Sequence, residues 1–123
     1  MTEQRLSDEQ VETYRRDGVV HIAGAVDADT VARMLAAVEA TMDAPSRFGG
    51  DMTGETGPGL FFQDRHLFPR NETYRSFLTE TPLAAMAAQA TGSTTIRAFY
   101  DHVFVKDPGT EEQFVWHQDR PYW

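Results

Sequence analysis

The sequence predicts an α+β fold in a single domain, with helices in its first part and strands in its last part. Apolar residues recur at helical spacing over residues 31–42. Glycine and proline gather over residues 44–59, and β-branched and aromatic residues fill residues 96–105. We therefore expect a mainly helical section over residues 1–92, interrupted by a glycine-rich loop at about 44–59, and a strand section over residues 93–123.

The composition is that of an acidic domain without cysteine. The chain has 123 residues and a formal net charge of -8, and it contains no cysteine. A negative field repels phosphate backbones, so we expect no nucleic-acid partner. Without thiolates, a metal ion must bind to histidine, aspartate or glutamate. The chain has no apolar run of about 20 residues and no apolar signal segment at its start, which predicts a cytoplasmic protein without a membrane partner.

Residues 7–17 predict the first helix. Ser7 can cap its first turn, and Gln10 stands three positions later, as in a capping box. Gly18 suits the left-handed conformation in which many helices end. Residues 19–22 hold three β-branched side chains and predict a short strand.

The next segment predicts a longer helix followed by the glycine-rich loop. Asp27 or Asp29 can cap a helix that reaches about Met42. Five glycines and two prolines then fall within residues 44–59. This composition predicts either a plain surface loop or a mobile lid beside a site. A phosphate-binding loop is excluded, because no Gly-Lys-Ser/Thr sequence occurs in the chain.

A short strand is expected at residues 60–62, before two short helices at residues 72–78 and 82–90. Thr81 can cap the second of these helices, and Gly92 can end it. Together with the two earlier helices, they make up the helical section.

Two strands are expected in the last part of the chain. Residues 96–105 form the clearer one, because β-branched and aromatic side chains occur throughout it. The sequence Asp-Pro-Gly-Thr at residues 107–110 predicts a turn. A second strand is expected at residues 114–117.

The main candidate site is the pair His117 and Asp119 at the end of the last predicted strand. Side chains two positions apart share one face of a strand, so the two would point the same way and Gln118 would point to the other face. One imidazole and one carboxylate are two of the three ligands of a facial triad, which holds non-haem Fe(II). A surface histidine and aspartate near a turn are the alternative interpretation, because a His-x-Asp triplet by itself is a weak signal.

Longer stretches of the chain resemble the phytanoyl-CoA dioxygenase family. Three regions carry this resemblance, and together they extend over nearly the whole chain. They are residues 14–20 (YRRDGVV), residues 61–64 (FFQD), and residues 99–110 (FYDHVFVKDPGT) with 116–119 (WHQD) and 121–123 (PYW).

The resemblance implies a non-haem Fe(II)- and 2-oxoglutarate-dependent dioxygenase on a double-stranded β-helix, which is a jelly-roll or cupin-like barrel. Fe(II) would be the metal and 2-oxoglutarate the co-substrate, with O2 and a small organic molecule as the other substrates. His117 and Asp119 would be the first two metal ligands and the catalytic residues. A carboxylate at position 119 implies hydroxylation, because halogenases of the family leave this ligand position vacant for chloride.

The resemblance also assigns three further residues to the pocket that binds 2-oxoglutarate. His102 lies on the preceding strand, where family members line the pocket for 2-oxoglutarate. Phe62 falls near another part of that pocket, and Gln118 is assigned to it as well. The alternatives of a structural histidine at position 102 and a core phenylalanine at position 62 stay open.

The sequence departs from the family on its C-terminal side. Family members are more than twice as long, and their third iron ligand and their 2-oxoglutarate-binding arginine lie far beyond the His-x-Asp pair. We therefore expect this chain to be the N-terminal half of such an enzyme, with the first strands of an incomplete barrel.

Two functions remain in view. One is an oxygenase that hydroxylates a small organic substrate when it is complete. The other is a catalytically inactive, truncated module that acts as a binding or assembly partner. Open strand edges would invite pairing with another chain or with the missing C-terminal half.

Overall fold

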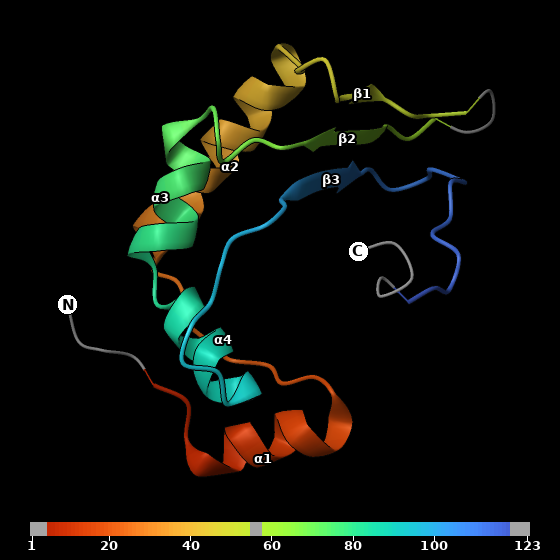
Figure 1. The fold of residues 1–123 in the computed structure, drawn as a ribbon. Coiled ribbons are helices and arrows are strands. Elements are labelled where there is room, and N and C mark those ends of the chain that lie inside the picture. The colour runs from red at the N-terminus through yellow and green to blue at the C-terminus, as the bar shows by residue number, and fades with distance from the viewer. Residues whose placement is uncertain (1–4, 55–57, 119–123) are drawn as a thin grey trace.

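The computed structural model describes residues 5–54 and 58–118, and this part of the chain has an α+β fold. Four helices and three strands follow one another in the order α1, α2, β1, β2, α3, α4, β3 within the described residues. The strands form an antiparallel sheet in the order β1-β2-β3. Figure 1 shows this sheet beside the paired helices α2 and α3, while α1 and α4 lie further from it. The α+β class is confirmed, and the double-stranded β-helix stays a prediction.

Helix α1 (Asp8–Asp17) begins and ends as its sequence predicts. The Ser7 hydroxyl accepts a hydrogen bond from the Gln10 backbone N–H at 3.2 Å, and the Gln10 side chain accepts one from the Ser7 N–H at 2.9 Å. Gly18 follows in the left-handed conformation, at a φ of 75°. The capping box therefore satisfies two N–H groups that an uncapped helix would leave without a partner.

Helix α2 (Ala28–Asp43) is capped by Asp27, so Asp29 lies inside its first turn. The Asp27 carboxylate accepts a hydrogen bond from the Thr30 N–H at 2.7 Å. The strand predicted at residues 19–22 is wrong, because these residues pair with no strand of the described sheet. Val19 is 67% exposed, whereas Val20 and Ile22 are half-buried, so the β-branched run packs only in part and pairs with no described strand.

Helices α3 (Glu72–Glu80) and α4 (Leu83–Thr91) follow β2. Asn71 caps α3 by accepting from the Thr73 N–H at 2.9 Å. The predicted capping of α4 by Thr81 is wrong, because the Thr81 hydroxyl donates backwards to the Phe77 carbonyl of α3 at 2.6 Å. Pro82 takes the cap position without a side-chain hydrogen bond.

The glycine-rich segment is only partly a loop. Strand β1 (Gly50–Asp51) lies inside it and pairs with β2 (Phe61–Arg65), which is longer than the sequence predicts. The Gly49 α-carbon packs against Asp64, because an added Cβ would lie 2.6 Å from the Asp64 Cβ. The glycines therefore allow close packing as well as turning.

Strand β3 (His102–Lys106) covers only the second half of the strand predicted at residues 96–105. Its five residues pair with the five residues of β2, from Phe61 opposite Lys106 to Arg65 opposite His102. Residues 96–101 lie beyond the end of β2, so no strand is available to pair with them. The strand predicted at residues 114–117 is also wrong, since this segment joins no ladder in the described part of the chain.

The core of the described residues is small and lies where β2 meets the helices. Its buried apolar side chains are Phe62, Leu67, Tyr74, Met86 and Ala90. The Tyr74 hydroxyl is 3.0 Å from the Thr41 hydroxyl, which joins α3 to α2. None of the helices that the structure describes is long and apolar enough to cross a membrane.

We expect Gly59→Ala to destabilise the fold by about 1–3 kcal/mol, as overpacking does. A Cβ at this position would lie 3.0 Å from the Pro108 carbonyl oxygen and closer still to the Thr110 nitrogen. Both obstacles are backbone atoms of the turn after β3, which is tied to Leu60 by the Asp107 N–H at 2.9 Å.

Urea unfolding measures this effect, with Gly18→Ala as the control. Gly18 has open space but a positive φ of 75°, so alanine there costs about 1 kcal/mol through the backbone alone. An unchanged midpoint for Gly59→Ala would show that the turn at residues 107–110 does not pack against β2 as described.

Candidate functional site

One face of the sheet brings together polar, charged and aromatic side chains of β2 and β3. Residues directly opposite in an antiparallel pair share a face, and alternate residues of a strand share it too. The register therefore places six side chains together, and we call this surface the ring face. It consists of Phe61, Gln63 and Arg65 from β2 and of His102, Phe104 and Lys106 from β3.

Rings run across the ring face in an unbroken series of contacts. His102 lies against Phe104, with ring centroids 3.7 Å apart. Phe104 stacks on Phe61 at 6.2 Å, and Phe114 meets both rings edge to face, at 4.9 Å and 5.4 Å. On the other side, Tyr100 is 5.7 Å from His102 and continues the series to His66 at 5.0 Å.

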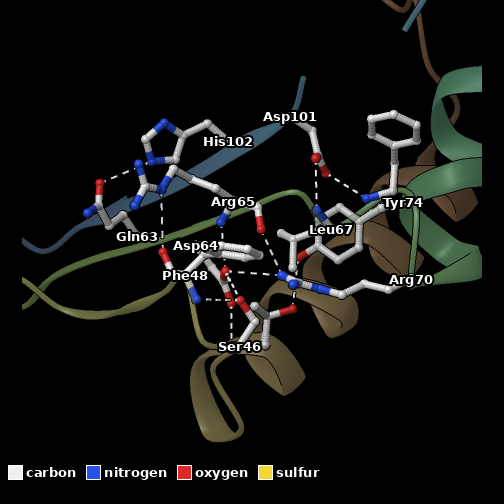
Figure 2. Close-up of polar contacts among 12 residues, drawn as sticks. Ser46, Phe48, Gln63, Asp64, Arg65, Leu67, Arg70, Tyr74, Asp101 and His102 are labelled. Atoms are coloured by element: carbon white, nitrogen blue, oxygen red, sulfur yellow. Dashed lines mark hydrogen bonds and ion pairs between the residues drawn. The ribbon is translucent and has the colours of Figure 1, made fainter. Parts of the chain in front are cut away.

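His102 stands in the middle of this series with both ring nitrogens engaged, and Figure 2 shows the contact of one of them with Gln63. Its Nε2 lies 3.0 Å from the Gln63 Oε1, which can only accept, so Nε2 carries the proton. Its Nδ1 then accepts from the Tyr100 hydroxyl at 3.3 Å. Burial lowers the pKa of His102, and the charge of the neighbouring Arg65 lowers it further. His102 is therefore a neutral imidazole at pH 7.

We expect Arg65→Gln to raise the pKa of His102, because this change removes a nearby positive charge while leaving the burial in place. Histidine side-chain signals followed by NMR across pH 4–8 measure it. Arg75→Gln on α3 is the control. A pKa that does not move in Arg65→Gln would mean that water screens Arg65 from the ring.

The ring face has positive charges and no carboxylate. Arg65 lies at the His102 end and Lys106 at the Phe61 end. Neither forms an ion pair with another described residue. The Lys106 ammonium donates to the Glu112 carbonyl and lies 5.9 Å from the Phe61 and Phe114 rings. In a chain of net charge -8, this is a local positive surface.

The opposite face of β2 carries Asp64, which is fully buried. Figure 2 shows its carboxylate held by the Ser46 N–H and hydroxyl at 2.8 Å and 2.6 Å, with Arg70 at 3.3 Å. Burial raises the pKa of Asp64, but the hydrogen bonds from Ser46 and from the Arg65 N–H, with the charge of Arg70, outweigh it and lower the pKa. Asp64 is thus a structural anion that fixes the segment after α2.

A second carboxylate fixes the segment that joins β2 to α3. The two oxygens of Asp101 accept from the Leu67 N–H at 2.8 Å and from the Phe68 N–H at 2.9 Å. His66 lies just before these residues at a φ of 58°, and its own N–H donates to the Asp101 carbonyl at 3.2 Å. Asp101 therefore positions the start of β3 next to the end of β2.

Of the two proposed metal ligands, the structure describes His117, which lies outside the sheet. His117 is exposed, and its Nδ1 donates to the Val115 carbonyl oxygen at 2.7 Å. Gln118 is exposed and belongs to no strand. Asp119 lies outside the residues that the structure describes, so its role stays a prediction.

The remaining predicted site residue, Phe62, is 3% exposed on the face opposite His102. This position places it in the core, and a contact with 2-oxoglutarate stays a prediction. Sequence reasoning missed Gln63 as the partner of His102 and Arg65 as its charged neighbour. Alternation along residues 61–65 was the available signal, but the partner strand depends on a register set by residues about 40 positions away.

The described residues do not assemble a complete metal site. In residues 5–54 and 58–118, no three His, Cys, Asp or Glu side chains are grouped so that they could hold a metal ion. The largest cavity that we describe has about 700 Å³ and lies between α2, α3 and the start of α4, lined by Met34, Phe77 and Pro82 among others. No predicted site residue lines it.

The architecture and the ring face define an α+β domain whose open sheet face carries a neutral histidine among rings and cations. A family model described as phytanoyl-CoA dioxygenase (PhyH) matches residues 14–123. The chain belongs to this family. No curated protein and no solved structure gives a significant match.

Proposed function

We propose that this chain forms part of a non-haem Fe(II)- and 2-oxoglutarate-dependent dioxygenase that hydroxylates a small organic substrate. Membership of the phytanoyl-CoA dioxygenase family supports oxygenase activity in general. The observation that carries the proposal to this chain is the state of His117, whose Nδ1 is bound to the Val115 carbonyl. A histidine that binds a metal ion commonly donates its other ring N–H to a backbone carbonyl in this way.

The donor set fits Fe(II) in kind. His117 would supply one nitrogen and Asp119 one oxygen, which are the ligand types of a facial triad. The third ligand and the arginine for 2-oxoglutarate would come from residues other than these. Fe(II), when bound with 2-oxoglutarate, supplies the oxidising chemistry that inserts an oxygen atom into a C–H bond.

The side chains of this chain would hold and shield the reacting molecules. The hydrogen bond to the Val115 carbonyl would fix the orientation of the His117 ring. The ring face would exclude water from one wall of the site. His102, whose ring is neutral and is held by Gln63 and Tyr100, adds a flat surface to this wall without adding charge.

A second candidate function is the inactive binding or assembly module. It is favoured by the incomplete ligand set in the described residues and by the outer edge of β3, which pairs with no further strand in the part of the chain that the structure describes. Unpaired strand edges recruit other strands. This function and the oxygenase are compatible if the partner completes the ligand set.

Metal titration tests the proposed function without requiring turnover. We expect Mn(II) or Fe(II), titrated under argon, to bind weakly to the chain, and at least about ten-fold more weakly to His117→Ala and to Asp119→Ala. His21→Ala is the matched control, because it removes a histidine outside the sheet and the motif. Equal binding by the His117 and control variants would rule out the motif as the metal site.

A further inference from the structure

The most distinctive surface outside the ligand pair is one end of the ring face, where three rings cluster and two of them lie beside a lysine. Phe61, Phe104 and Phe114 contact one another at centroid distances of 4.9–6.2 Å. Phe104 is 42% exposed and Phe114 is 51% exposed. A large aromatic ring that stays exposed to water does not gain the stabilisation that its burial would provide. A cluster of such rings on one surface therefore indicates a binding surface.

The lysine at this end is arranged to receive an anion. Its ammonium has three N–H donors, and one of them is used on the Glu112 carbonyl. The Glu112 carboxylate is turned away to the Gly54 N–H at 3.0 Å. Lys106 therefore keeps two donors beside the Phe61 and Phe114 rings, at 5.9 Å from each centroid.

We propose that the ring face binds a planar aromatic carboxylic acid, with its carboxylate on Lys106 and its ring system stacked on Phe104 and meeting the perpendicular Phe114 ring edge to face. This inference rests on the proposed function and names the class of substrate that the same site would take. Flat rings offer stacking and edge contacts that an aliphatic or polyhydroxyl molecule cannot match. The lysine provides the charge that selects an acid.

The same composition argues against other substrate classes. A cationic or zwitterionic substrate would need a carboxylate near its ammonium group, and the six positions of the ring face include none. Arg65, at the other end, is four residues from Phe61 along β2, which corresponds to about 13 Å in a strand. At this distance Arg65 does not compete for the carboxylate that lies on Lys106.

Binding of 2-naphthoate to the whole 123-residue chain tests the proposal, measured by calorimetry and by NMR shifts of the aromatic signals. Two matched probes separate the contributions: decahydro-2-naphthoate keeps the charge without the rings, and 2-naphthalenemethanol keeps the rings without the charge. We expect each to bind about three- to ten-fold more weakly than 2-naphthoate.

Variants locate the binding on the ring face. Phe104→Leu keeps an apolar side chain but removes the ring, and Lys106→Gln removes the charge. Each should weaken 2-naphthoate binding by about three- to ten-fold, whereas Arg75→Gln on α3 should leave it unchanged. Urea unfolding of each variant verifies that it remains folded.

Several outcomes would overturn the inference. Equal binding of the saturated acid, equal binding of the alcohol, or unchanged binding in Phe104→Leu would each do so. A chain that is dimeric in sedimentation, and monomeric as Phe104→Leu, would show that a second copy covers the ring face instead. Because 2-naphthoate binding needs no metal, failure here leaves the metal titration of His117→Ala as an independent result on the proposed function.

Discussion

Asp64→Ala is expected to destabilise the protein by about 3 kcal/mol or more, a large share of the roughly 5–15 kcal/mol that a domain has in total. The carboxylate is fully buried, and it accepts hydrogen bonds from the Ser46 N–H, the Ser46 hydroxyl and the Arg65 N–H. Alanine would leave these donors without the acceptor that they have in the folded state. The side chain of Arg70 is 35% exposed, so water replaces part of the interaction that Arg70 loses with the Asp64 carboxylate.

Urea unfolding followed by circular dichroism measures this loss, with Asp43→Ala as the control. Asp43 is an exposed carboxylate at the C-terminal end of α2, so its removal should change stability by less than about 0.5 kcal/mol. If the two variants unfold at the same urea concentration, Asp64 does not hold the segment after α2.

The same carboxylate makes the stability depend on pH. The folded state lowers the pKa of Asp64, so its contribution is fully present above the ordinary aspartate pKa of about 3.9. It is lost as the pH falls from there through the folded-state value. We therefore expect the stability difference between the wild type and Asp64→Asn to be constant from pH 7 to about pH 5 and to shrink below pH 4. A difference that stays constant to pH 3 would contradict this.

No succinate is expected from 2-oxoglutarate when the 123-residue chain is assayed alone with Fe(II) and ascorbate. His117 and Asp119 would supply two metal ligands. Among the described residues, no three His, Cys, Asp or Glu side chains are grouped so that they could hold a metal ion. 2-Oxoglutarate also needs a cationic partner for its far carboxylate, and each lost hydrogen bond to a charged group costs about 1.5–3 kcal/mol. Weak metal binding and weak co-substrate binding together make turnover undetectable.

Succinate detection by mass spectrometry decides this point. Turnover by the wild-type chain that disappears in His117→Ala but persists in His21→Ala would show that the chain itself completes the site. Such turnover would also exclude the inactive assembly module as the function of the isolated chain.

Local sequence signals explain the parts of the fold that were predicted well. The ends of α1 and α2 depend on a few neighbouring residues, and Ser7, Gln10, Gly18 and Asp27 act there as their chemistry dictates. Capping bonds span three residues, so the sequence contains all the information that they need.

Strands were predicted less well because a strand needs a partner. The β-branched run at residues 19–22 is left unpaired, and residues 96–101 extend beyond the end of β2. Conversely, the two residues of β1 have no strand pattern of their own and are extended because β2 lies beside them. Pairing of this kind is decided by tertiary contacts and overrides local propensity.

The candidate site also has one part that the sequence reveals and one part that it does not. The His-x-Asp pair is visible as a motif, because its two residues are close in sequence. The ring face is invisible in the sequence, because Gln63 and His102 meet only through the register of β2 with β3.

Paramagnetic broadening by Mn(II) tests most directly whether His117 binds the metal. Small amounts of Mn(II) would be added to the chain while the ring signals of His21, His66, His102 and His117 are followed by NMR. We expect His117 to broaden first, since a ligand nucleus lies closest to the ion, and the broadening to disappear in Asp119→Ala. If His66 or His102 broadens before His117, the metal site lies elsewhere and the assignment of the His-x-Asp pair is wrong.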